Sequence, residues 1–242
     1  RREGALSELC GFALVNGALS FRGAGRYGLE FASEQQPVIE RYLSMLRRWL
    51  SIEAGMHIRH TDRLGGQTLY ALAMADQDAV RALDALMLLD PQMPFGLRTT
   101  PHPAMMAADN QRRALLRGAF LAGGSVVSPG KAYHLEIVLQ DALAGCVQQL
   151  MQGFSLPARI STRKAQQLVY LKGAEDVSDM LALMGASVGV MELENVRAMK
   201  SLRNEVNRQV NCDQNNLDKT VAAAEKQVSV IRAIERHMGL NQ

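Results

Sequence analysis

Basic and hydroxyl side chains occupy every second position in two short stretches of the sequence, His57, Arg59, Thr61 and Arg63 within residues 55–63 and Arg159, Ser161 and Arg163 within residues 158–163. Alternate residues of a β-strand point to the same face, so each stretch predicts a strand with one basic face. Lysine and arginine contact nucleic-acid phosphates through charge, and two such faces would suit a saddle across a DNA duplex. We therefore predict double-stranded DNA as the partner. The predicted DNA-contacting residues are His57, Arg59, Arg63, Lys131, Arg159, Arg163, Lys164 and Lys172.

A basic strand face has a second interpretation, because surface strands are commonly solvated and charged. A module that binds another protein, and no longer touches DNA, would show the same pattern. The arginines of the two stretches separate these hypotheses, since only direct DNA contact makes them necessary for binding to promoters.

No other group of side chains predicts a metal or cofactor site. The five histidines include no H-x-x-x-H pair, and His57 and His60 fall on opposite faces of a predicted strand. The glycine pairs are too short for a dinucleotide-binding loop. The three cysteines are scattered and odd in number, which indicates a reducing compartment rather than a disulfide framework. We expect neither a metal nor a cofactor.

Composition places the chain among globular proteins. It has 242 residues, a formal net charge of +3 and 48% apolar residues. No stretch approaches the roughly 18 apolar residues that a membrane span requires, and the N-terminus lacks a signal sequence. We expect a cytoplasmic, nucleoid-associated monomer without membrane contact. The slightly positive charge permits an anionic partner.

Two similar segments, LCGFALVNGAL at residues 9–19 and LRGAFLAGGSV at residues 116–126, lie 107 residues apart. Each predicts a helix whose small residues share a face, where a second helix could approach closely. The final glycines are expected to end the helices, at Gly123-Gly124 by adopting the left-handed conformation. The predicted helix–helix interface comprises Gly11, Gly17, Gly118, Ala122 and Gly124.

The elements after each segment recur in the same order: hairpin, helix, hairpin, helix. This duplication predicts an α+β protein with two similar halves. The predicted first-half elements are strands 18–22, 27–33, 55–61 and 68–74 and helices 37–50 and 76–89. The predicted second-half elements are strands 126–127, 133–137, 158–162 and 167–172 and helices 141–153 and 174–184. The predicted divisions are a first half at 1–90, a proline-rich linker at 91–108, a second half at 109–187 and a helical segment at 188–242.

The last segment is polar and strongly helical, with sparse apolar positions. We predict two helices that meet near residues 211–216, where asparagines favour a break and a new N-cap. With so little apolar surface, these helices are expected to pack on the main body rather than around a core of their own.

The duplicated glycine-bearing helices, each followed by a four-stranded half-sheet, resemble the LAGLIDADG homing endonucleases. More closely, the whole chain resembles the WhiA family of bacterial regulators. The matching motifs are LRGAFLAGGSV, Lys131-Ala-Tyr-His-Leu-Glu136, Glu194-Asn-Val-Arg197, Arg203-Asn204, Val206-Asn207-Arg208, Val210-Asn211-Cys212, Asn216-Leu217 and Lys219-Thr220. The resemblance implies a pseudo-twofold, duplicated LAGLIDADG-like fold.

The resemblance also bears on catalysis. In the endonucleases each LAGLIDADG helix ends with an acidic residue before its final glycine, and the two acids hold the divalent metals that cleave DNA. Here Asn16 and Gly123 occupy those positions, and neither supplies a carboxylate. The resemblance therefore implies a protein that is not an enzyme. A residual nuclease that uses other acids, such as Asp109 or Glu136, is the remaining catalytic hypothesis.

The family resemblance implies a DNA-binding transcriptional regulator linked to sporulation, cell division and chromosome segregation. Its implied partners are promoter DNA and a sigma factor or another transcription protein. The family carries a helix-turn-helix module after its interdomain helices, and we expect that module to be missing, since the chain stops at Gln242 and starts at Arg1 like a trimmed chain. The predicted interdomain residues are Arg203, Asn207, Arg208, Asn211 and Lys219.

Overall fold

The helices and strands of the chain follow the duplication in its sequence. A computed structural model describes residues 1–21, 23, 26–61, 67–164 and 166–239, except the side chains of Thr61, Gln67 and Pro94. The first-half elements are α1 (Arg2–Asn16), β1 (Ala18–Phe21), β2 (Tyr27–Ser33), α2 (Gln36–Leu50), β3 (Gly55–Thr61), β4 (Gln67–Ala75) and α3 (Asp76–Ala85). The second-half elements are α4 (Asp109–Gly123), β5 (Gly124–Val126), β6 (His134–Leu139), α5 (Asp141–Gln152), β7 (Arg159–Arg163), β8 (Gln166–Lys172) and α6 (Ala174–Met184). The predicted order of elements is confirmed.

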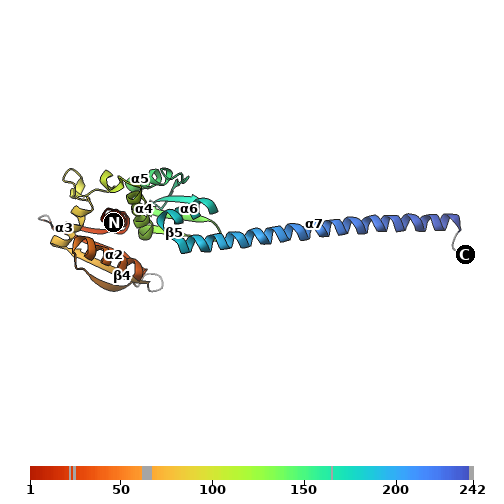
Figure 1. Ribbon diagram of the computed structural model, residues 1–242, viewed down its shortest axis with the longest axis horizontal. Coiled ribbons are helices and arrows are strands. Elements are labelled where there is room, and N and C mark those ends of the chain that lie inside the picture. The colour runs from red at the N-terminus through yellow and green to blue at the C-terminus, as the bar shows by residue number, and fades with distance from the viewer. Residues whose placement is uncertain (22, 24–25, 62–66, 165, 240–242) are drawn as a thin grey trace. The chain divides into compact units, whose positions relative to one another are not determined.

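Each half contains one four-stranded antiparallel sheet, with order β1-β2-β4-β3 in the first and β5-β6-β8-β7 in the second (Figure 1). The strand registers of the two sheets match, so paired positions in the first sheet have equivalents in the second. Glu30 pairs with Ala18 as Glu136 pairs with Ser125. Likewise Arg59 pairs with Leu69 on β4, and Arg163 pairs with Gln166 on β8.

Helices α1 and α4 cross closely at the centre of this unit, and two glycines make the crossing possible. A Cβ atom on Gly11 would fall on the backbone carbonyl of Leu115, and one on Gly118 would fall on that of Glu8. Any larger residue would therefore force the helices apart. The predicted close approach at Gly11 and Gly118 is confirmed.

Aromatic and aliphatic side chains form the core beneath the first sheet. The ring of Phe12 on α1 lies 5.3 Å from that of Phe31 on β2 and 4.3 Å from that of Tyr42 on α2, centre to centre. All three side chains are completely buried. Burial of one such side chain stabilises the fold by roughly 1.5–3 kcal/mol, so this cluster fixes α1 and α2 on the sheet.

The glycines at the helix ends have a different role from the predicted one. Gly124 caps α4 with extended backbone angles, φ −89° and ψ 153°, so the expected left-handed turn is wrong. A Cβ atom there would collide with the ring of Phe120, and one on Gly17 would collide with the carbonyl of Ala13. These glycines avoid clashes with their own helices, while the crossing itself depends on Gly11 and Gly118.

The connection between the halves is more regular than its prolines predicted. It contains two short 3₁₀ helices, Pro94–Gly96 and Pro103–Met106. Pro103 occupies the first turn, where a helix does not need the missing N–H. His102 caps this turn by accepting a hydrogen bond from the amide of Ala104 at 3.2 Å. Helix α3 ends at Ala85, earlier than predicted, and Met87 then takes a positive φ of 53°.

The chain divides into two compact units, Arg1–Val190 and Met191–Gln242. Helix α7 (Ser187–Met238) is uninterrupted (Figure 1), so the predicted break near residues 211–216 is wrong. Between Val190 and Met238 there is neither glycine nor proline. Each asparagine costs a helix only a fraction of a kcal/mol relative to alanine, which is too little to stop it. Among the described helices, none is long and apolar enough to span a membrane.

Candidate nucleic-acid interface

The predicted basic residues of the second half share one face of their sheet. Residues Leu135, Ile137, Val169 and Leu171 are buried on the side that the helices cover. Their strand neighbours therefore point the opposite way. We call the second sheet's opposite side its outer face; its residues are Ser125, His134, Glu136, Val138, Arg159, Ser161, Arg163, Gln166, Leu168, Tyr170 and Lys172. Arg159, Arg163 and Lys172 are all exposed there.

Contacts among side chains order part of this outer face. Nε2 of His134 lies 3.1 Å from Oε2 of Glu136, and the His134 and Tyr170 ring centres are 5.7 Å apart. Nζ of Lys172 lies 5.3 Å from the centre of the Tyr170 ring. Arg159 is the register partner of Tyr170 on the neighbouring strand. The result is a half-buried aromatic ring flanked by cations, a combination that suits phosphates and bases.

The first sheet has an outer face of different character. Where the second sheet has His134, Tyr170 and Lys172, the equivalent positions are the small residues Gly28, Ala73 and Ala75. Arg59 forms an ion pair with Glu30, so its charge is compensated within the sheet. His57 is exposed on the same face.

The remaining predicted DNA-contacting residues lie in connections. Lys131 is exposed in the segment between β5 and β6. Lys164 is exposed at the turn between β7 and β8, with a positive φ of 49°. Arg63 lies outside the described residues. The structure therefore brings three cations together on the second sheet but only one on the described part of the first.

The two positions without acids are occupied in a way that closes them to a metal. Nδ2 of Asn16 donates a hydrogen bond to the carbonyl of Ala122 at 3.1 Å, which ties the end of α1 to the end of α4. A Cβ atom on Gly123 would lie 2.8 Å from Cγ1 of Val15 and 2.9 Å from the carbonyl oxygen of Val138. Position 123 therefore has no room for a side chain of any kind.

The other candidate acids have side-chain partners. Asp109 forms an ion pair with Arg112 in the first turn of α4, and Glu136 lies within hydrogen-bond distance of His134. In the part of the chain that the structure describes, no three His, Cys, Asp or Glu side chains are grouped as metal ligands.

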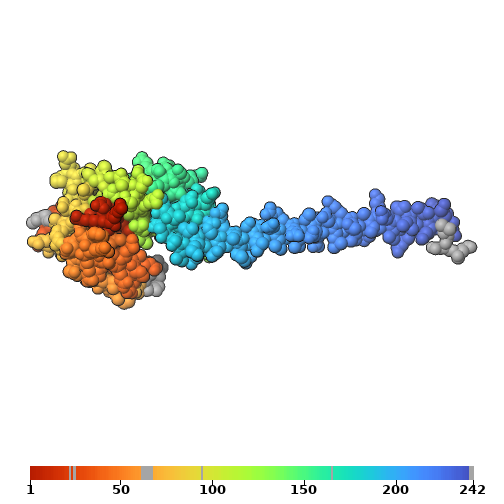
Figure 2. Space-filling view, viewed as in Figure 1, coloured from red at the N-terminus to blue at the C-terminus, as the bar shows by residue number. Residues whose placement is uncertain are grey.

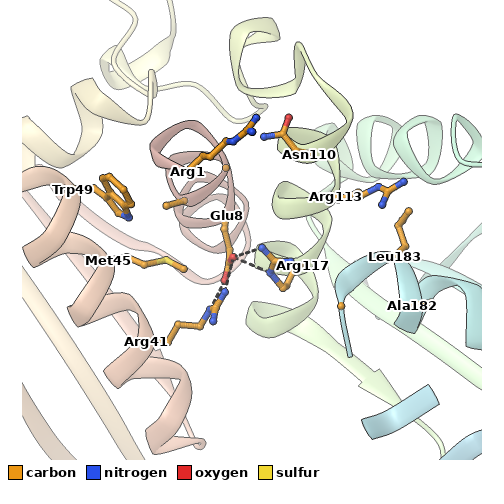
Figure 3. A pocket seen from close by; sticks show the side chains of 13 residues that line it. Arg1, Glu8, Arg41, Met45, Trp49, Asn110, Arg113, Arg117, Ala182 and Leu183 are labelled. Atoms are coloured by element: carbon orange, nitrogen blue, oxygen red, sulfur yellow. Dashed lines mark hydrogen bonds and ion pairs between the residues drawn. The ribbon is translucent and has the colours of Figure 1, made fainter. Parts of the chain in front are cut away.

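A buried charge cluster between the halves went unpredicted. The carboxylate of Glu8 on α1, only 1% exposed, accepts hydrogen bonds from Arg41 of α2 at 2.6 and 3.0 Å. It also accepts bonds from Arg117 of α4 (Figure 3). Arg117 further donates to the carbonyl of Met184 at 3.1 Å. The bond to Glu8 raises the pKa of Arg41. Burial, with the nearby Glu8 charge, raises the pKa of Tyr42 far above its usual range.

The predicted interdomain residues lie on α7 with exposed side chains. These residues are Arg203, Asn207, Arg208, Asn211 and Lys219. Nε of Arg208 donates to the carbonyl of Asn204 at 3.2 Å, a contact within the helix. Their role in orienting a second module stays a prediction.

Two family models match the chain. A model of the WhiA LAGLIDADG-like domain matches residues 7–85 and 112–203, and a model of the WhiA C-terminal HTH domain matches residues 206–242. A probable cell division protein WhiA of Clostridium botulinum (strain Eklund 17B / Type B) is 32% identical over 244 residues, covering 100% of this chain and 77% of that protein. One of Clostridium novyi (strain NT) is 33% identical with the same coverage.

Solved structures show the same fold. Full-length DUF199/WhiA from Thermatoga maritima superposes with a TM-score of 0.69 at 22% identity, covering 100% of this chain and 76% of that one. I-DmoI in complex with DNA and Mn superposes with a TM-score of 0.54 at 15% identity, covering 76% of this chain and 97% of that one. The chain therefore has the duplicated α+β fold of the LAGLIDADG homing endonucleases, as predicted.

The expectation that the helix-turn-helix module is missing is wrong, because residues 206–242 match the model of that domain. Up to residue 239 the structure gives this segment the form of one helix followed by a single turn residue. A helix-turn-helix needs two helices joined by a short turn. Within the described residues, the matched segment contains a helix of the module without a second one.

Proposed function

The chain belongs to the WhiA family, and we propose that it is a DNA-binding transcriptional regulator that does not cut DNA. The observation that carries this proposal is the second sheet's outer face, where Arg159 and Lys172 flank a half-buried Tyr170 and Arg163 lies further along the same face. Three cations within one sheet face provide the charge that phosphate contact requires.

Two comparisons support DNA as the partner. Part of the chain matches a helix-turn-helix domain, a module that commonly places one helix in the major groove. The protein I-DmoI, which shares the fold, forms a complex with DNA and Mn. We infer that this chain uses its sheets and its helical segment on the same duplex, with promoters as the sites and the cytoplasmic nucleoid as the place of action.

The absence of nuclease activity is supported by the ends of α1 and α4. A metal-dependent nuclease of this fold needs a carboxylate from each helix. Asn16 uses its side chain to hold Ala122, and position 123 is filled by its neighbours. We infer that these helix ends join the two halves and hold no catalytic metal.

The name of the relatives, probable cell division protein WhiA, supports a role in cell division. Regulation of sporulation and chromosome segregation, monomeric state and contact with a sigma factor or another transcription protein belong to the same proposal. So do the divisions at 1–90, 91–108, 109–187 and 188–242 and the interdomain role of the α7 side chains.

A protein-binding module that leaves DNA to the helical segment is the second candidate. The first sheet favours it, because Arg59 is neutralised by Glu30 and small residues replace the ring and cations of the second sheet. In that case, promoter binding by the full chain would not depend on either outer face.

The test is binding of the chain to duplex DNA across a series of salt concentrations. We expect affinity to fall steeply with salt, and Lys172→Met to reduce the slope of log K against log salt by about 1. Arg47→Met is the matched control, because Arg47 lies on α2 and pairs with Glu53. Binding that is unchanged in Lys172→Met and Arg159→Ser would contradict the proposal in favour of the protein-binding module. Binding that is independent of salt would contradict phosphate contact by any part of the chain.

A further inference from the structure

A pocket of about 640 Å³ lies between the two halves, lined by residues of α1, α2 and α4 and by the end of α6 (Figure 3). Figure 2 shows the red N-terminal atoms at the surface between the orange atoms of the first half and the yellow-green atoms of the second. The volume falls within the range of roughly 300–1,000 Å³ typical of small-molecule sites. All lining residues belong to the unit Arg1–Val190.

Three helical stripes build the walls of this pocket. Arg41, Met45 and Trp49 lie at spacings of four on α2. Asn110, Arg113 and Arg117 lie at spacings of three and four on α4, and Gly4 and Glu8 lie four apart on α1. Residues at these spacings share a helix face, so each helix points its stripe at the same space.

The electrostatics of the pocket favour an anion. Among its described lining residues, Glu8 is the single carboxylate, against the guanidinium groups of four arginines, Arg1, Arg41, Arg113 and Arg117. Glu8 is already satisfied by Arg41 and Arg117. Arg113 is exposed and makes no ion pair in the described structure; its guanidinium lies 5.6 Å from the ring centre of Phe154. The N-terminus of α4, which begins at Asp109, adds its partial positive charge beside Asn110.

The opposite wall is apolar and aromatic. In Figure 3, Trp49 and Met45 lie on one side of the Glu8 cluster, and Arg113 and Asn110 lie on the other. Trp49 and Met45 are both partly exposed, so each offers surface to a ligand. A planar ring packs well on such a wall, while guanidinium groups bind phosphate through paired hydrogen bonds.

We propose that this pocket binds a phosphorylated ligand of mononucleotide size. The phosphate contacts Arg113, and the planar ring lies against Trp49 and Met45 on the α2 side of the pocket. Because Trp49 and Met45 belong to the first half and Arg113 to the second, a bound ligand bridges the halves. The site is separate from both outer faces and independent of the proposed DNA contact.

The experiment is thermal unfolding of the chain with adenosine and guanosine mono-, di- and triphosphates, each compared with inorganic phosphate. We expect at least one nucleotide to raise the unfolding midpoint by about 5 °C at a concentration 100-fold above its Kd. Arg113→Met should weaken binding of that nucleotide about tenfold. Trp49→Leu should weaken binding of the nucleotide but leave binding of inorganic phosphate unchanged. Arg47→Met, on α2 outside the pocket, should change neither.

Four results would overturn the proposal. The first is no shift of the unfolding midpoint with any nucleotide at about 10 mM, a concentration above the Kd of any useful affinity. The second is an unchanged midpoint shift in Arg113→Met, and the third is an equal midpoint shift with inorganic phosphate. The fourth is loss of the midpoint shift in Lys172→Met. The last result would place the nucleotide on the second sheet's outer face. Circular dichroism of each variant separates loss of binding from loss of the fold, since Arg113 and Trp49 take no part in the buried Glu8 cluster.

Discussion

The outer faces of the two sheets have the same register but different side chains. Both have a glutamate at the same position, Glu30 and Glu136, and both have an arginine at the same position, Arg59 and Arg163. In the first sheet the two charges pair with each other. In the second, Glu136 lies 3.1 Å from Nε2 of His134, and Arg163 has no carboxylate partner in the described structure. One backbone plan therefore supports a neutral face and a cationic face.

The centre of the unit shows the opposite relation, because there the halves are equivalent in chemistry as well as in backbone. Gly11 and Gly118 each meet the backbone of the other helix. A steric requirement at a helix crossing applies to both partners at once, whereas a surface face can change one side chain at a time. The fold thus depends on symmetry at its crossing and tolerates asymmetry on its surfaces.

The largest expected effect tests the symmetric part. Gly118→Ala and Gly11→Ala should each destabilise the protein by about 3 kcal/mol or more, because the new methyl group meets backbone that cannot move aside. Urea unfolding measures both. The matched control is Gly145→Ala, since Gly145 lies inside α5 with open space around it and should gain about 0.5–1 kcal/mol. Unequal losses of stability in Gly11→Ala and Gly118→Ala would show that the two halves are not equivalent at the crossing.

The next effect tests the asymmetric part. Arg159→Ser should lower DNA affinity about tenfold, the size expected for loss of one phosphate contact at low salt. Arg59→Ser should lower it less than threefold, because Glu30 already holds that guanidinium. Fluorescence anisotropy with a labelled duplex compares the two. Glu30→Gln should free Arg59, so that in this background Arg59→Ser lowers DNA affinity by an amount closer to that of Arg159→Ser. Equal losses of affinity for the two serine variants of the unmodified protein would show that both faces bind alike.

A third expectation concerns the cores. Tyr42 on α2 is fully buried, and its hydroxyl has no hydrogen-bond partner in the described structure. The equivalent position of the second half, on α5, is the apolar Val147. Tyr42→Phe should therefore stabilise the protein by about 1 kcal/mol in urea unfolding. A loss of stability would mean that a solvent molecule satisfies the hydroxyl.

The same residue predicts a pH dependence. The pKa of Tyr42 is raised by burial, so the folded state keeps the proton while the unfolded chain releases it above about pH 10. This stability is present below pH 10 and is lost as pH rises further. Cys10, whose pKa burial raises to about 12, acts in the same direction from about pH 9. Tyr42→Phe should lose less stability than the wild type between pH 10 and 11.

The smallest effect concerns the turn between β7 and β8. Lys164 has a positive φ of 49°, a conformation that glycine adopts without cost. Lys164→Gly should change the free energy of unfolding by less than about 1 kcal/mol, in the stabilising direction. It should lower DNA affinity two- to threefold if this cation lies within reach of a phosphate. A change in stability without a change in affinity would remove Lys164 from the interface.

Much of the fold follows from local patterns in the sequence. Alternation along residues 27–33 and 133–137 predicted strands there, and the repeated glycine spacing predicted the helix crossing. Alternation also placed Arg159 and Arg163 on one face, because a strand has a fixed period of two. These inferences needed only neighbours in the chain.

The features that could not be predicted depend on residues far apart in the sequence. The pairing of Arg59 with Glu30 depends on sheet register, and the burial of Glu8 depends on Arg41 and Arg117 reaching it from two other helices. A glutamate in an apolar helix was a signal, since such a carboxylate needs partners when buried. The stripe of Asn110, Arg113 and Arg117 was a second signal of the pocket.

The packing at Gly123 bears on how this scaffold could change over evolutionary time. A single Gly123→Asp substitution would not restore a metal site, because the new side chain would meet Val15 and the backbone of β6. Asn16→Asp would replace a donor with a carboxylate facing the Ala122 carbonyl. Each substitution alone would therefore cost stability without creating a metal site. Both helix ends, and the groups packed against them, would have to change together before a metal could bind there. The packing of the helix ends therefore limits which single substitutions the fold can accept.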